Sequence, residues 1–114
     1  MKIAIFSIHK FEKESLKKMK VDLTEVPPRY RSTYFSHIFS GGYAAGYFSY
    51  LWTDMLEEDI YSWFKDNGGL TRANGQRLRD MILSRGNTED YGKMFRAFRG
   101  HDPDINPMLK SRGL

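Results

Sequence analysis

Residues 43–66 read YAAGYFSYLWTDMLEEDIYSWFKD, and this stretch decides which fold the chain can adopt. Its apolar side chains recur at the three- and four-residue spacing of one helix face, while polar side chains fill the other face. The apolar set is Phe48, Leu51, Trp52, Met55, Leu56, Ile60 and Trp63. The pattern predicts one long helix, mostly over 43–66, that ends near Asn67 because Gly68 and Gly69 tolerate a positive φ.

Two shorter helices are predicted after this one. Thr71 can cap a helix that stops at Gly86, with Leu78, Met81 and Ile82 pointing inward. Asn87 or Thr88 can cap another helix, which stops at Gly100. Its inward residues are Tyr91, Met94, Phe95 and Phe98. The tail beyond Asp102 contains two prolines, so it should begin as a loop and allow at most one last turn.

Upstream of the long helix, residues 11–20 are also expected to be helical. Pro27 and Pro28 stop any helix, and residues 29–39, which are rich in aromatic and β-branched side chains, are expected to be extended. Periodicity does not decide whether residues 1–8 form a short strand or the start of a helix. The expected fold is therefore all-α, in a single helical domain over residues 1–114.

Composition limits the classes of function. The chain has 114 residues, 18 Lys and Arg against 14 Asp and Glu, and no cysteine. The length supports one core, and the lack of cysteine excludes disulfides and thiolate metal sites. No apolar run approaches the roughly 20 residues that span a bilayer, so no membrane partner is expected. A net charge of +4 argues only weakly for nucleic acid, and we expect a cytoplasmic protein.

The stretch from Tyr34 to Trp52 contains a histidine, a glycine pair and, after that pair, three tyrosines. Tyr43, Tyr47 and Tyr50 are spaced i, i+4 and i+7, so all three phenols are expected on one helix face. His37 stands just across the glycine turn and could fold back towards that face. Phenols stay protonated at pH 7, so these groups could form a set of neutral hydrogen-bond donors. Donors aimed at a carbonyl oxygen that is becoming an oxyanion can each contribute on the order of 3 kcal/mol. However, aromatic residues at helical spacing are also common in cores, and spacing alone leaves both interpretations open.

The same stretch resembles the zinc metallopeptidase family that includes thimet oligopeptidase, neurolysin and the bacterial peptidyl-dipeptidases. The matching residues are His37, Gly41-Gly42-Tyr43 and Tyr50-Leu51-Trp52. The segments VPPRYRSTYF, GGYAAGYFSYLW, GGLTRANGQRLRDMILSRGN and PMLKSRGL are most similar to the bacterial dipeptidyl carboxypeptidase branch. The resemblance runs from about Phe11 to Leu114, and residues 1–10 lie outside it. It implies the helical C-terminal portion of a zincin-like catalytic domain, from an enzyme that releases C-terminal dipeptides from peptides.

That family holds zinc with an H-E-x-x-H helix and a downstream glutamate, which this sequence lacks. The three histidines, His9, His37 and His101, include no pair at i, i+4 spacing. The resemblance therefore implies that zinc belongs to the full-length enzyme. We expect no metal site and no catalysis from this chain alone, and a missing N-terminal part as its partner.

The resemblance also implies roles for residues that are present. Tyr50 would donate to the oxyanion. His37, which the resemblance places with Tyr50 in catalysis, would hold the substrate backbone together with Tyr43. Gly41 and Gly42 would let the loop close on the peptide. A cation must hold the substrate's terminal carboxylate, and the candidates are Arg29 and Arg31, although both could instead form structural ion pairs.

Two other functions remain open from the sequence. The chain could be a free-standing, non-catalytic helical domain that binds a peptide or a partner protein. A nucleic-acid-binding module is disfavoured because the positive charge does not alternate with the tyrosines as a stacking groove requires. If helices normally pack on missing segments, the isolated chain should expose an apolar patch and tend to form a homo-dimer.

Overall fold

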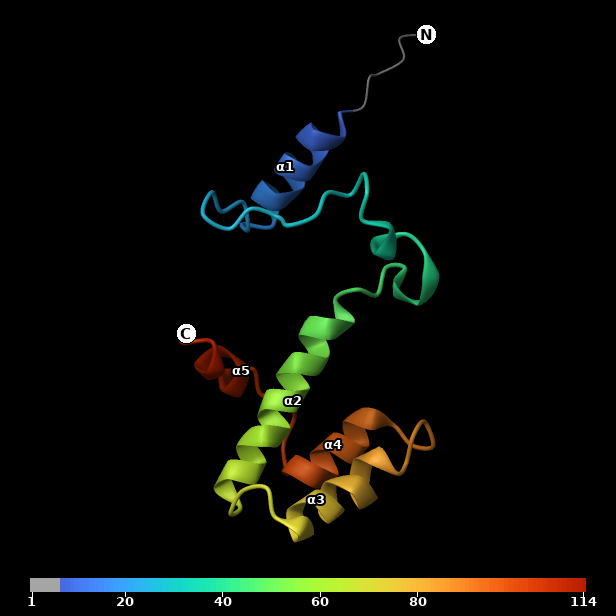
Figure 1. The fold of residues 1–114 in the computed structure, drawn as a ribbon, viewed down its shortest axis with the longest axis vertical. Helices are drawn as coiled ribbons and strands as arrows, with labels where there is room; N and C mark the ends of the chain where they lie inside the picture. The colour runs from blue at the N-terminus through green and yellow to red at the C-terminus, as the bar shows by residue number, and fades with distance from the viewer. Residues whose placement is uncertain (1–6) are drawn as a thin grey trace. The chain divides into compact units, whose positions relative to one another are not determined.

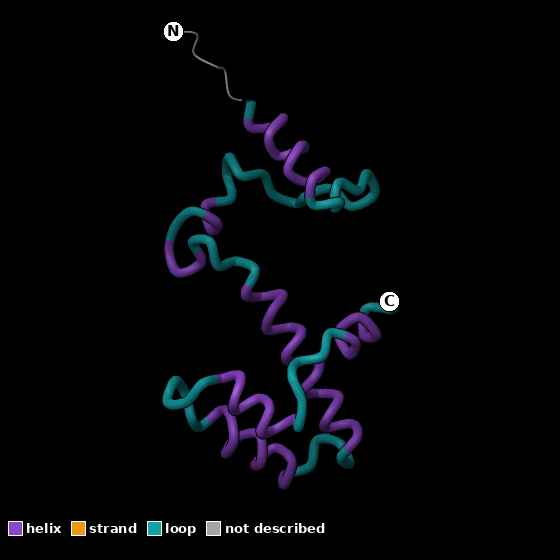
Figure 2. The backbone as a smooth tube through the Cα atoms, turned by 180° about the vertical axis from the view of Figure 1, so that it is seen from behind, coloured by secondary structure: helices purple, strands orange, loops and turns teal. Residues whose placement is uncertain are grey.

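The computed structural model describes residues 7–114, which form helices joined by loops with no strand among them (Figures 1 and 2). The α-helices are α1 (Ile8–Lys18), α2 (Ser49–Asp66), α3 (Arg72–Leu78), α4 (Tyr91–Arg99) and α5 (Asn106–Ser111). Two single 3₁₀ turns, η1 (Ser36–Ile38) and η2 (Gly41–Tyr43), precede α2, and a π-helical turn, η3 (Arg79–Leu83), extends α3. The all-α prediction is confirmed. The question of strand or helix for residues 1–8 falls almost entirely outside the described residues.

The chain divides into two compact units, residues 1–47 and 48–114, where the sequence predicts one helical domain. Among the described residues, every fully buried side chain lies in the second unit. From residue 7 on, the first unit is α1 followed by a long run of turns, and the side chains of these described residues are exposed or half-buried. The second unit therefore contains the hydrophobic core, and the first carries most of the predicted site residues.

The helix α2 begins at Ser49, which is later than the predicted start at residue 43. Gly41 and Ala45 have φ values of 69° and 53°, which are left-handed and interrupt a right-handed helix. The prediction that Tyr43, Tyr47 and Tyr50 share one helix face is therefore wrong, because only Tyr50 lies on α2. The predicted end is confirmed: the helix stops before Asn67.

The later helices follow the sequence signals with two exceptions. Thr71 caps α3 as predicted, with its hydroxyl accepting a hydrogen bond from the Asn74 amide at 3.2 Å. The cap of α4 is Asp90 rather than Asn87 or Thr88, and its carboxylate accepts from the Lys93 amide at 2.7 Å. Gly100 ends α4 with φ 86°, as expected. The final helix, α5, has 6 residues, more than the single turn predicted.

The core of the second unit is small and draws on three helices. Its buried apolar residues are Phe64 from α2, Met94, Phe95 and Phe98 from α4, and Met108 from α5. Trp63 packs on Phe98 with ring centroids 4.7 Å apart, and the guanidinium of Arg77 lies 5.3 Å from both rings. Arg77 also donates a hydrogen bond to the Phe98 carbonyl at 3.1 Å, which joins α3 to the end of α4.

A fully buried carboxylate, Asp59, lies beside this apolar core. The Arg99 guanidinium donates to its Oδ1 from Nε at 2.7 Å, and the backbone amide of Asp104 donates to its Oδ2 at 2.9 Å. Arg99 also donates to the Ser62 hydroxyl at 3.3 Å. Each carboxylate oxygen has a donor, so this buried charge is paired and hydrogen-bonded. The arrangement ties α2 to α4 and to the segment that leads into α5.

We predict that Arg99→Met destabilises the second unit by about 3 kcal/mol or more, because it leaves the Asp59 charge buried without its cation. Methionine keeps most of the apolar contact of the arginine stem, so the loss reports mainly on the ion pair. The free energy of unfolding in urea measures the effect. The matched control is Arg96→Met on the same helix, because Arg96 pairs with Asp102 at 3.0 Å on the surface and should contribute less than about 1 kcal/mol. Equal losses in the two variants would contradict the assignment.

Candidate functional site

The segment between Arg29 and Phe39 turns back on itself instead of running extended as predicted. The Phe35 amide donates to the Arg31 carbonyl at 3.0 Å, and η1 follows directly. Further on, the Ala45 amide donates to the Ile38 carbonyl at 3.3 Å, which closes a loop around the glycine pair. This folding brings together the aromatic rings that lie on either side of the glycine pair.

The result is an aromatic cluster that contains His37 and Tyr43. Their ring centroids lie 6.1 Å apart, and the Tyr47 ring lies 5.8 Å from His37 and 5.7 Å from Tyr43. Phe35 packs edge-on against Tyr47 at 4.8 Å and lies 5.2 Å from His37. The imidazole and both phenols remain partly exposed, with Tyr43 at 39% and Tyr47 at 37%. The structure thus groups two of the predicted site residues at a surface that a peptide could reach.

Tyr50, the predicted oxyanion donor, belongs to the second unit, on the first turn of α2. Its side chain is 55% exposed and lines an open cleft of about 440 Å³ along one side of that helix. The other lining residues are Leu51, Thr53, Asp54, Glu57 and Arg112. Asp54 and Arg112 form an ion pair across this cleft, so the C-terminal segment is attached to α2 one turn beyond Tyr50.

The two predicted glycines, Gly41 and Gly42, differ in backbone conformation. Gly41 has a left-handed φ of 69°, which L-amino acids adopt only at a cost in free energy. Gly42 has no such φ, and a Cβ added to either glycine would meet no atom within 4 Å. Gly41 therefore has a structural reason to be glycine, whereas at Gly42 the structure requires neither a special φ nor close approach.

The two candidate cations for a substrate carboxylate have different surroundings. The Arg29 guanidinium stacks over the Tyr30 ring at 5.2 Å from its centroid. Arg31 lies 3.5 Å from the Glu12 carboxylate. The Ser32 hydroxyl and amide donate to the same carboxylate at 2.6 and 2.8 Å. These hydrogen bonds from Ser32, with smaller contributions from the charges of Arg31 and His9, hold the pKa of Glu12 below its ordinary value of 4.5.

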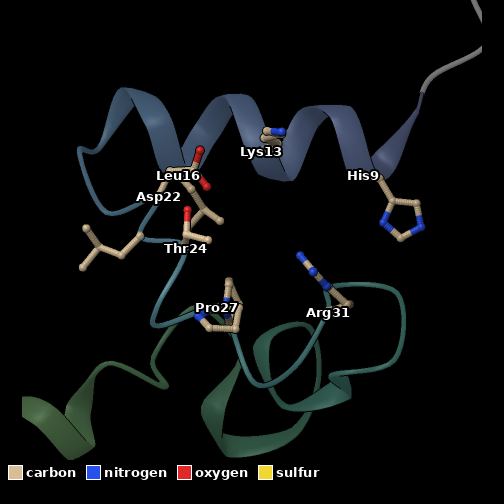
Figure 3. A pocket seen from close by; sticks show the side chains of 9 residues that line it. His9, Lys13, Leu16, Asp22, Thr24, Pro27 and Arg31 are labelled. Atoms are coloured by element: carbon tan, nitrogen blue, oxygen red, sulfur yellow. The ribbon is translucent and has the colours of Figure 1, made fainter.

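A cleft of about 320 Å³ lies between α1 and the loop that leads to Arg31 (Figure 3). His9 and Lys13 line it from α1, and Arg31 points toward that helix from the opposite wall, while Asp22 lies near the far end. Three basic side chains thus surround one opening, where an anionic group such as a carboxylate could bind.

Sequence reasoning missed several residues that shape these sites. Phe35 joins the aromatic cluster, and the cluster of aromatic residues from Tyr30 to Phe35 was the available signal. Lys13 faces Arg31, but α1 and the loop are distant in sequence, and no sequence pattern connects them. Asp59 falls four residues after Met55 and four before Trp63, inside the predicted apolar face of α2, which marks it as a buried acid.

In residues 7–114, no group of three His, Cys, Asp or Glu side chains is arranged to hold a metal ion. None of the helices in this range combines the length and apolar character needed to cross a membrane.

Comparison with known proteins matches residues 5–114 to Peptidase family M3. The chain is 58% identical over 112 residues to the dipeptidyl carboxypeptidase of Salmonella typhimurium and 56% identical over 111 residues to that of Escherichia coli. These alignments cover 98% and 97% of this chain but only 16% of each relative. Oligopeptidase A of Salmonella typhimurium is 50% identical over 80 residues, which is 70% of this chain and 12% of that protein. The family match begins at residue 5, earlier than the resemblance found from Phe11 onward.

We predict that the packing of α1 against the Ser32 loop weakens in acid. The folded-state pKa of Glu12 is lowered, so its stabilisation is complete above its ordinary value of 4.5 and is lost as the pH falls through the folded value. The measurement is the amide chemical shift of Ser32 followed by NMR as the pH falls. Glu12→Gln should abolish the transition. Glu14→Gln, which alters an exposed carboxylate on the same helix, should leave it in place; an unchanged transition in Glu12→Gln would refute the mechanism.

We also predict that Gly41→Ala and Gly42→Ala behave differently. Alanine at residue 41 must adopt the left-handed φ and should destabilise the turn by about 1 kcal/mol, whereas alanine at residue 42 has room and an ordinary φ. The His37–Tyr43 nuclear Overhauser contacts measure whether the loop persists. They should weaken in Gly41→Ala and survive in Gly42→Ala, and the reverse order would show that the turn geometry is wrong.

Proposed function

This chain belongs to Peptidase family M3, and we propose that it is the C-terminal, substrate-binding portion of a zinc-dependent peptidyl-dipeptidase, an enzyme that releases dipeptides from the C-termini of peptides. One observation carries the choice within the family. The relatives named dipeptidyl carboxypeptidase align with nearly the whole chain, whereas oligopeptidase A aligns with 70% of it and at lower identity. The proposed substrate is a peptide, and the proposed location of the enzyme is the cytoplasm.

The zinc that such an enzyme requires does not fit the residues of this chain that the structure describes. A catalytic zinc site needs three protein ligands and an open position, and residues 7–114 contain no group of three suitable side chains. The zinc, and the activation of water that such an ion would supply, would belong to the rest of the polypeptide. The residues of this chain can therefore contribute binding, orientation and hydrogen-bond donation.

We assign the oxyanion donor to Tyr50, which would act with His37 in catalysis. Its phenolic O–H is a hydrogen-bond donor, is half exposed, and lies on the first turn of α2. A preorganised donor of this kind stabilises negative charge that develops on the scissile carbonyl oxygen. His37 and Tyr43, whose rings lie together on the other unit, would hold the substrate backbone beside the cleaved bond. The loop of Gly41 and Gly42 would close over that backbone.

We assign the substrate's terminal carboxylate to Arg31 in preference to Arg29. Arg31 shares its cleft with Lys13 and His9, so a second cation is at hand, whereas Arg29 is stacked on Tyr30. Glu12 neutralises part of the Arg31 charge and orients its guanidinium by an ion pair on one side. The remaining donors of the guanidinium are available for a bidentate contact with a carboxylate.

A second candidate is a free-standing, non-catalytic helical domain that binds a peptide or a partner protein. The observation that favours it is the large exposed apolar surface of the second unit, which also supports association of two copies as a homo-dimer. The two candidates differ in what they require: the first needs the remainder of a peptidase, and the second does not.

We predict that the purified chain hydrolyses no peptide, with or without added zinc, because nothing in residues 7–114 holds a metal-bound nucleophile. Release of a dipeptide from a blocked short peptide is the assay. Turnover by this chain alone that depends on zinc would overturn the division of roles.

In a full-length relative, changing the tyrosine that matches Tyr50 to phenylalanine should lower kcat by a factor of about 10² to 10³ with a smaller change in KM, as loss of one oxyanion donor does elsewhere. The control is the corresponding change at the residue matching Tyr61, which lies further along α2 and is 45% exposed. An unaffected kcat in the first variant would remove Tyr50 from the mechanism.

A further inference from the structure

The second unit carries an apolar groove that its own side chains do not fill. It has a volume of about 190 Å³ and is lined by Trp52, Leu56 and Ile60 of α2, Ile82 of η3, Tyr91, Gly92 and Phe95 of α4, and Pro103. The three α2 residues are spaced by four, so they form one stripe along the helix. Phe95 is buried beneath the groove, while Trp52 and Tyr91 are each 56% exposed at its edge. The groove has room for a large apolar side chain.

Exposed apolar side chains are abundant in the second unit, and two of them, Trp52 and Tyr91, line this groove. Five apolar residues are buried in the second unit, whereas ten large apolar or aromatic side chains are exposed there: Phe48, Tyr50, Leu51, Trp52, Tyr61, Leu70, Leu83, Tyr91, Ile105 and Leu114. Water-soluble monomers rarely leave large contiguous apolar surface uncovered. An aromatic rim around a partly filled pocket is the usual form of the central contact in a protein interface.

The identity of the group that fills the groove follows from the proposed function, on which this inference rests. We propose that the groove receives an apolar side chain from the zinc-bearing remainder of the peptidase polypeptide. In the dipeptidyl carboxypeptidase relatives, the matched region is only 16% of the length, so most of the polypeptide lies outside it. If Tyr50 donates to an oxyanion formed beside the zinc, the part that holds the zinc must approach the N-terminal half of α2. Trp52, at the mouth of the groove, follows Tyr50 by two residues.

The groove would then do more than stabilise the fold. An apolar side chain inserted against Trp52 and Tyr91 would fix α2 on the zinc-bearing part, and Tyr50 is carried on the same helix. The contact is desolvated and rimmed by aromatic residues, so single substitutions there should weaken association strongly. Exposed apolar residues outside the groove should contribute little.

The test is association in two chains. The tagged 114-residue chain is co-expressed with the part of the Salmonella typhimurium dipeptidyl carboxypeptidase that lies outside the matched 112 residues. We expect co-purification at a one-to-one ratio. Trp52→Arg and Tyr91→Arg should each reduce the retained partner about tenfold or more. The matched control is Leu83→Arg, because Leu83 is 67% exposed and lies outside the groove lining. Circular dichroism confirms that each variant is folded, and two groove variants are used so that one can decide if the other unfolds.

Three outcomes would overturn the proposal: no retention of the partner by the unaltered chain, groove variants that bind as well as Leu83→Arg, or a homo-dimer of this chain that Trp52→Arg dissociates in sedimentation velocity. The last would show that a second copy occupies the groove. Dipeptide release by the two-chain complex separates this proposal from the proposed function. A complex that depends on the groove but releases no dipeptide would refute the proposed function and leave the groove proposal standing. An active complex that forms equally well with Trp52→Arg would refute the groove proposal and leave the proposed function standing.

Discussion

The ion pair between Asp59 and Arg99 is the interaction on which the second unit depends. It joins α2 to α4 inside a core of only five buried apolar residues, and the second oxygen of Asp59 also fixes the backbone of Asp104 before α5. A charge with no access to water is tolerated only with its partners in place, so this arrangement selects one relative position for the three segments. Tyr50 is therefore held on a helix whose second half is fixed by a buried charge.

The first unit has no comparable constraint in its described residues. Its α1 is fixed to the Ser32 loop by Glu12, through hydrogen bonds at a partly exposed site. In the cluster of His37, Tyr43 and Tyr47, the ring centroids lie near 6 Å apart at an exposed turn. Contacts of this kind order a loop weakly, because little apolar area is removed from water. A turn of low stability would suit the loop closure that is proposed for Gly41 and Gly42.

The helices were largely predictable from the sequence, because apolar spacing and glycine stops act locally. The periodicity that predicted α2 placed its end correctly before Asn67, and Thr71 and Gly100 bounded later helices as expected. The start of α2 was not predictable in this way, because the apolar spacing continues through Tyr43 and Tyr47. Ala45 adopts a left-handed φ there, which cannot be predicted from an alanine. The proximity of His37 to Tyr43 was anticipated from the glycine turn. The cleft of Lys13 and Arg31 was not, because it depends on tertiary packing between distant segments.

Native-state hydrogen exchange of the isolated chain tests the central claim most directly: that stability resides in the core around Asp59 and not in the turn that contains Gly41 and Gly42. The amides of Phe64 in α2 and Phe98 in α4 should exchange slowest, at rates that report unfolding of the whole second unit. The amides from Arg31 to Tyr47 should exchange many times faster, through local opening. Protection of the Phe39 and Ala45 amides, which donate to Ser36 and Ile38, equal to that of Phe98 would contradict the account.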